Sequence, residues 1–157
     1  MALGIRQIRD ALISHLMVLG VFDTVSARAP DALPGTGVHG LVAFNRMVPA
    51  RSSGLDATSM VPIFTVFVLV PLEQEPADDI DIVLLEATDP ILASLIGDFT
   101  LGGLVRMVDV RGSEQSGGGT GAGLTVQTGH MTFPDQRYRF AEITVPLIVN
   151  DIYPEAP

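Results

Sequence analysis

The sequence predicts an α+β fold: two helices packed on a mostly antiparallel sheet of about five strands, in a single domain. Two segments carry apolar residues at helical spacing, and five carry β-branched and apolar residues between turn residues. Most of the predicted strands follow one another directly, which favours helices on one face of an antiparallel sheet. A length of 157 residues, 47% of them apolar, fits one domain with a substantial core.

The helices are expected at residues 3–19 and 77–96. In the first, apolar residues recur at steps of three and four, and Gly20 is a plausible stop. The second carries the same pattern at Ile80, Leu84, Ala87, Ile91 and Leu95. Pro90 interrupts it, either as the first residue of a second helical segment or as a kink.

The strands are expected at 38–48, 60–72, 104–110, 124–133 and 138–149, with a short extended piece at 21–25. Residues 60–72 are apolar at both odd and even positions, which predicts a central strand buried on both faces. Pro62 should lie near its start, where a missing N–H is tolerated. The last two strands form a hairpin. The domain is expected to span residues 1–149, followed by an extended C-terminal tail at 150–157.

Charge and composition exclude several classes of function. The net charge is −9, and all nine basic residues are arginines. This balance argues against binding nucleic acid through its phosphates, and an acidic surface would instead let DNA slide past. The absence of cysteine excludes disulfides, thiolate metal sites and cysteine nucleophiles. No apolar run is long enough for a membrane helix, so we expect a protein made in a cytoplasm with no membrane partner.

No motif for catalysis or cofactor binding is found. The glycine-rich segment 112–123 lacks the lysine of a phosphate-binding loop and leads into a strand pattern rather than a helix. His15, His39 and His130 lack metal-ligand spacing. The carboxylates at 78–81 lack the glycine of a calcium loop and suit a helix N-terminus. We therefore expect no catalytic, cofactor-binding or metal-binding residues, and not an enzyme.

Three segments carry a resemblance to known proteins: RSSGLDATS (51–59), leading into the long apolar strand; the stretch 78–103, above all GDFTLGGLVRMVDV (97–110); and RYRFAEITVPLIVND (137–151). In combination they resemble a family of small tail proteins of siphophages that infect actinobacteria, regarded as tail terminators. The resemblance covers nearly the whole chain. The glycines of SGGGTGAG depart from it, because similar sequences generally have fewer at this point.

The resemblance implies a hexameric ring in the virion, at the neck-to-tail junction. Such a ring caps the tail tube, stops its polymerisation and joins the tail to the head–neck complex. The implied partners are other copies of the chain, the major tail tube protein and the head–tail connector or neck proteins. DNA would pass through the lumen without specific binding, and no cofactor is implied.

A closed ring needs two different contact surfaces on each subunit. One pair of candidates is the hairpin at 124–149 and the C-terminal tail, for which fraying is an equal alternative. The long loops at 26–37, 51–59 and 112–123 are the others, since assemblies commonly order such loops, although disorder in the free subunit is equally expected. The candidate interface residues are Ser52, Ser53, Gly54, Leu55, Gly117, Gly118, Gly119, Asn150, Asp151, Ile152 and Tyr153. The candidate acidic residues of the lumen are Asp78, Asp79 and Asp81.

Two other interpretations stay open. The chain could be a head–tail connector, a stopper or a tail-tube protein, although a tube protein should have a long stacking hairpin and two sheets. The helix at the start and the helix in mid-chain fit a terminator better. A small ligand-binding domain or an enzyme is the more remote alternative, since no convergent polar constellation is evident.

Overall fold

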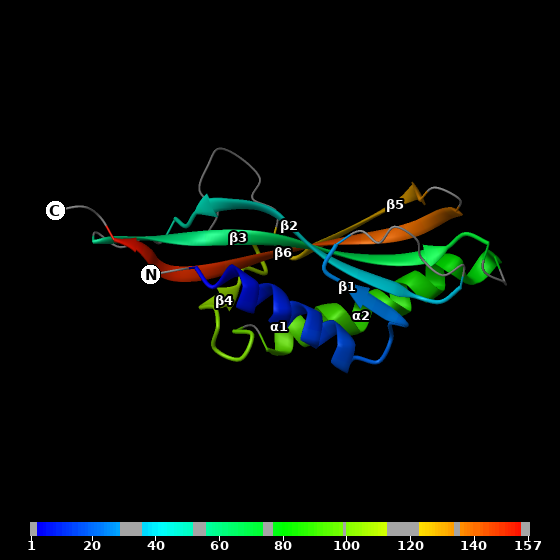
Figure 1. Cartoon of the computed structure of the whole chain (residues 1–157), viewed down its shortest axis with the longest axis horizontal. Coiled ribbons are helices and arrows are strands. Elements are labelled where there is room, and N and C mark those ends of the chain that lie inside the picture. Colours follow the sequence, from blue (N-terminus) through cyan, green and yellow to red (C-terminus); the bar gives the residue numbers. More distant parts are fainter. Residues whose placement is uncertain are drawn as a thin grey trace.

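The computed structural model describes residues 3–28, 36–51, 56–73, 77–98, 100–112, 123–133 and 136–154. It confirms an α+β fold, in which two helices cover one face of a curled, mixed sheet (Figure 1). The elements are α1 (Ile5–Val18), β1 (Thr24–Ser26), β2 (His39–Pro49), β3 (Ala57–Pro71), the short 3₁₀ turn η1 (Ala77–Asp79), α2 (Ile80–Gly97), β4 (Met107–Val108), β5 (Thr125–Phe133) and β6 (Gln136–Pro154).

The two longest strands, β3 and β6, pair along almost their whole length and form the centre of the sheet. The strand order is β1-β2-β3-β6-β4, and β5 also pairs with β6. Every pair is antiparallel except β1 with β2, which is parallel. The predicted hairpin is therefore confirmed as β5 and β6, and the predicted mostly antiparallel sheet is confirmed as well.

One core lies between the helices and the sheet. Along β3, the residues at even positions from Phe64 to Val70 face the helices, because side chains alternate along a strand. Alternate residues of β6, from Ala141 to Val149, do the same. Helix α2 buries its whole predicted stripe, Ile80, Leu84, Ala87, Ile91 and Leu95. Helix α1 buries the middle of its predicted stripe, Ile8, Leu12 and Leu16, whereas Leu3 and Leu19 at its two ends are only partly buried and Ile5 is 39% exposed.

The other face of β3 is buried too, as predicted for a central strand. Val61, Ile63 and Leu69 are each at most 1% exposed, and the first two belong to a second, smaller apolar cluster with Ile148. Pro62 lies further inside β3 than expected, because the strand begins at Ala57. The register between β3 and β6 skips Val61 and Pro62, and Pro62 has no N–H to donate.

Three boundaries differ from the predictions. Strand β4 has two residues rather than seven, because turns occupy its flanks. Helix α2 runs through Pro90 as one element. The predicted tail is part of the sheet up to Pro154, because β6 continues past residue 149 and pairs again with the start of β3.

Two neighbouring leucines of α2 allow a matched test of this packing. Leu84 is 1% exposed and Leu85 is 56% exposed. We expect Leu84→Ala to lower the free energy of unfolding by about 2–5 kcal/mol, because it leaves a cavity in the core. Leu85→Ala should change it by less than about 0.5 kcal/mol. Urea denaturation measures both, and equal losses would contradict the assigned orientation of α2.

Tyr138 on β6 is 1% exposed, and its hydroxyl donates a hydrogen bond to Gln136 Oε1 at 3.1 Å. Burial raises the pKa of Tyr138 above its ordinary 10.0. The neutral phenol thus contributes stability below pH 10, which is lost as the pH rises through the pKa of the folded state. In Tyr153→Phe only this tyrosine remains, so phenolate absorbance should appear at a higher pH in the folded protein than in urea. If the phenolate absorbance appeared at the same pH in the folded protein and in urea, the burial of Tyr138 would be contradicted.

Candidate functional site

Helix α2 is apolar on two sides, although the domain buries only one of them. Ile82, Leu85, Asp89, Leu92 and Ile96 follow one another at steps of three and four, and we call these five residues the outer stripe. Leu92 is partly buried and also packs against the core. Ile82, Leu85 and Ile96 are 53%, 56% and 52% exposed. Several large apolar side chains exposed on one face of a helix mark a contact site, so the outer stripe is a candidate contact surface.

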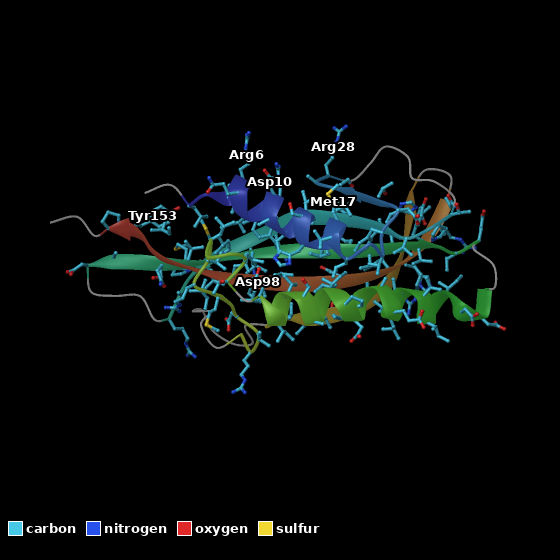
Figure 2. All side chains as sticks on the ribbon, turned by 90° about the horizontal axis from the view of Figure 1, so that it is seen from below. Arg6, Asp10, Met17, Arg28, Asp98 and Tyr153 are labelled. Atoms are coloured by element: carbon cyan, nitrogen blue, oxygen red, sulfur yellow. The ribbon has the colours of Figure 1, made fainter. Side chains whose placement is uncertain are left out.

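The outer stripe faces away from α1. Ser94 of α2 contacts His15 of α1, with 2.9 Å between Oγ and Nδ1. At 3.6 residues per turn, the outer stripe lies on the opposite side of α2 from Ser94. The two helices lie side by side on the sheet (Figure 2), so the stripe is turned towards the flank of the molecule that α1 does not occupy.

A second apolar surface lies on the α1 side. A groove between the start of α1 and β2 has a hollow of 720 Å³, with Leu3, Ile5, Arg6, Phe44 and Met47 among its lining residues. An adjoining hollow shares Ile5, Arg6 and Phe44 and reaches Phe64 beneath them. Phe44 is 50% exposed, and its ring meets the edge of Phe64 with 5.5 Å between centroids. We call this surface the α1–β2 groove.

The two surfaces carry opposite charges. Arg6 and Arg28 project from the α1 side of the molecule, away from α2 (Figure 2). Arg9 also lines the groove but binds Asp10 at 3.0 Å. Helix α2 contains Asp81, Glu86 and Asp89 and no basic residue.

Asp81 binds Arg139, with 2.9 Å between the carboxylate and Nε. Within the described ranges, Arg6, Glu86 and Asp89 have no ion-pair partner.

The three predicted lumen carboxylates gather at the start of α2. Asp78 and Asp79 lie in η1 and are exposed, as is Asp81 one turn further on. Arg139 binds Asp81 and also donates to Thr128 Oγ1 at 3.2 Å, so it ties α2 to β5 and β6. Asp81 therefore has a local structural partner, and only Asp78 and Asp79 remain as exposed charges without an ion pair in this described cluster.

The predicted interface residues at the end of β6 lie at an irregularity of the ladder. Thr58 pairs with Tyr153 and Met60 with Val149, so β6 carries extra residues between them. Asn150 is exposed and Tyr153 is 47% exposed, but Ile152 is 5% exposed and belongs to the core. Figure 1 shows this end of β3 and β6 extending beyond the helices.

The other predicted interface residues, Ser52 to Leu55 and Gly117 to Gly119, lie outside the described residues.

Neither the outer stripe nor the α1–β2 groove was predicted as a site from the sequence. The stripe has a sequence signal, because residues 82–96 repeat the three-and-four spacing of the buried stripe beside it. The groove has none, since it exists only where α1 meets β2.

A serine, a histidine and an aspartate also meet between the helices. His15 contacts Ser94 Oγ through Nδ1 and Asp98 Oδ2 through Nε2, at 2.9 and 3.2 Å. The composition is that of a hydrolase triad, but Ser94 lies inside a helix, not on an exposed turn. The hollow beside Ser94 is lined by apolar residues such as Leu12 and is too small for a water molecule. Ser94 therefore has no space beside it for a substrate, and the cluster fastens α1 to α2, with Asp98 45% exposed at its outer end.

Asp98 also shapes the segment GDFTLGG, which carries part of the resemblance. Its Oδ1 accepts a hydrogen bond from Gly102 N at 3.2 Å. Leu101, Gly102 and Gly103 have φ values of 50°, 67° and 89°, a left-handed conformation in which glycine is favoured. Leu101 bears a side chain there and is 3% exposed, so its burial offsets the strain. This part of the motif forms the turn that ends α2.

Two substitutions of Asp98 distinguish its contact with His15 from its hydrogen bond with Gly102 N. Asp98→Ala should lower the free energy of unfolding by about 1–2 kcal/mol, because it leaves Gly102 N without its acceptor and removes the His15 contact. Asp98→Asn keeps an oxygen for Gly102 N and should lose less. Thermal and urea denaturation of both variants test this. Equal losses would show that the negative charge, and not the turn, sets the stability.

Within the described residues, no cluster of three or more histidine, aspartate or glutamate side chains could hold a metal ion. In the same part of the chain, no helix is long and apolar enough to cross a membrane.

No known protein family matches the chain, and no curated protein sequence matches it either. Among solved structures, a chain described as part of the virion of a native gene transfer agent (GTA) particle is similar, with 14% identity and a TM-score of 0.38. The similarity covers 89% of this chain and 92% of that chain. A TM-score this low does not establish a shared fold, so it does not place the chain in a family.

Proposed function

We propose that the chain is a structural, non-catalytic protein of a tailed-phage virion: the tail terminator. The observation that carries this proposal is the pair of different apolar surfaces on one chain, the outer stripe of α2 and the α1–β2 groove. A subunit that closes a ring by head-to-tail contacts needs two such surfaces. The segments RSSGLDATS, GDFTLGG and PLIVND, which resemble tail terminators, specify the kind of ring.

In this proposal, a ring of six copies caps the last ring of tail-tube subunits, stops polymerisation and joins the head–neck complex. The subunit is made in the host cytoplasm and then resides at the neck-to-tail junction. The extended end of β3 and β6, with Asn150 and Tyr153 exposed, is a candidate for contact with a neighbouring ring. The loop residues at 52–55 and 117–119 remain candidates for the same role.

The lumen in this proposal lets DNA pass without holding it. A net charge of −9 repels phosphates, and the exposed carboxylates of Asp78 and Asp79 are the candidates for facing the DNA. Asp81 contributes less, since Arg139 lies against it.

Deleting the gene from the phage that encodes the chain tests the proposal. Without a terminator the tube keeps polymerising, so electron micrographs should show overlong tails that carry no heads. Expression of the intact gene from a plasmid is the control and should restore tails of normal length. Tails of normal length in the deletion would contradict the proposal, as would particles in which the chain lies away from the neck-to-tail junction.

A further inference from the structure

We infer that the outer stripe of α2 in one copy docks into the α1–β2 groove of the next copy. This inference rests on the proposed ring and names the contact that closes it. Both surfaces carry exposed apolar side chains: Leu85 and Ile82 project from the stripe, and Ile5 and Phe44 line the groove. Burying exposed apolar side chains against one another is the general source of association energy.

The charges of the two surfaces favour the outer stripe of a second copy as the partner that fills the groove. Arg6 lines both hollows of the groove, and Arg28 projects on the same side. Asp89 lies at the centre of the stripe, and neither Arg6 nor Asp89 has an ion-pair partner within the described part of the chain. Docking would bring an arginine and a carboxylate together within a largely apolar contact, which fixes register and excludes wrong partners.

The placement of the two surfaces suits a ring. The stripe faces away from α1, whereas the groove is formed by α1 itself with β2. Figure 2 shows α2 along one side of the molecule and Arg6 at the other. A contact between opposite sides of successive copies is heterologous, so it can repeat from subunit to subunit until the ring closes.

A symmetric contact between two outer stripes is disfavoured. Asp89 is the middle residue of the stripe, which begins at Ile82 and ends at Ile96. Antiparallel pairing of two such helices would place Asp89 beside its own copy, and like charges that face each other in an apolar contact destabilise it. The stripe therefore fits the basic groove better than it fits itself.

The natural lack of cysteine permits a direct test, because an introduced cysteine is the only thiol in the protein. Leu85→Cys and Ile5→Cys place one thiol on each surface, at exposed positions. Mixed at high concentration with a short bis-maleimide, the two variants should give cross-linked heterodimers, while neither should react with itself. A chain with both cysteines should give a ladder of products. Met17→Cys, on an exposed part of α1 outside the groove, is the matched control for Ile5→Cys and should give no product with Leu85→Cys.

Charge reversal provides a second measurement. Arg6→Glu is added to the Ile5→Cys chain, or Asp89→Arg to the Leu85→Cys chain. Either change alone should lower the yield of cross-linked heterodimer about tenfold, a loss of about 1.4 kcal/mol in the free energy of association. The two reversals in opposite partners should restore the yield, because they recreate the pair.

Three results would overturn the inference: no heterodimer from the mixture, self-cross-linking of Leu85→Cys alone, or equal yields with the Met17→Cys control. If the deletion strain has overlong tails but the cross-linking gives no heterodimers, the tail-terminator proposal stands and this contact is rejected. Heterodimers from a protein whose deletion leaves tail length normal would retain the contact and reject the terminator.

Discussion

The pairing of β3 with β6 is the constraint on which the rest of the structure depends. The two strands form a continuous antiparallel centre, and every other strand attaches to one of them or to their neighbour β2. Side chains of β3 are buried on both faces, so its register cannot shift by one residue without exchanging the two apolar sets. Phe64 and Val66 then face the helices, and Val61 and Ile63 face the second cluster.

This centre determines where the helices lie and which of their surfaces remain free. Helix α2 packs one apolar stripe on β3 and β6, and Arg139 and His15 hold it from its two sides through Asp81 and Ser94. These contacts fix the orientation of α2, so its outer stripe faces solvent. Helix α1 covers the β2 side, where Phe44 lies only half beneath it. The sheet thus produces two unpaired apolar surfaces of opposite charge.

Local patterns predicted those elements whose burial follows a simple period. The structure confirms the stripe from Ile80 to Leu95 and the burial of residues 60–72 on both faces. Both could be predicted because the spacing of apolar residues along the chain follows the period of a helix or a strand. The seven-residue strand expected at 104–110 was wrong, since only Met107 and Val108 meet β6. The strand expected to end at residue 149 continues to Pro154, because Tyr153 pairs with Thr58 of β3 and Ile152 is buried in the core.

The sequence by itself determined the fold class, the two buried helix stripes, the central strand and the absence of thiol chemistry, because these depend on composition and on spacing between near neighbours. Only the tertiary structure decided which side of α2 stays exposed, where Arg6 and Phe44 form a groove, and that His15 meets Ser94 and Asp98. Those features join residues that lie far apart in the chain, and their positions follow from how the β3–β6 centre orients each helix. A periodic pattern indicates that a residue can be buried, but only the packed structure shows which residues cover it.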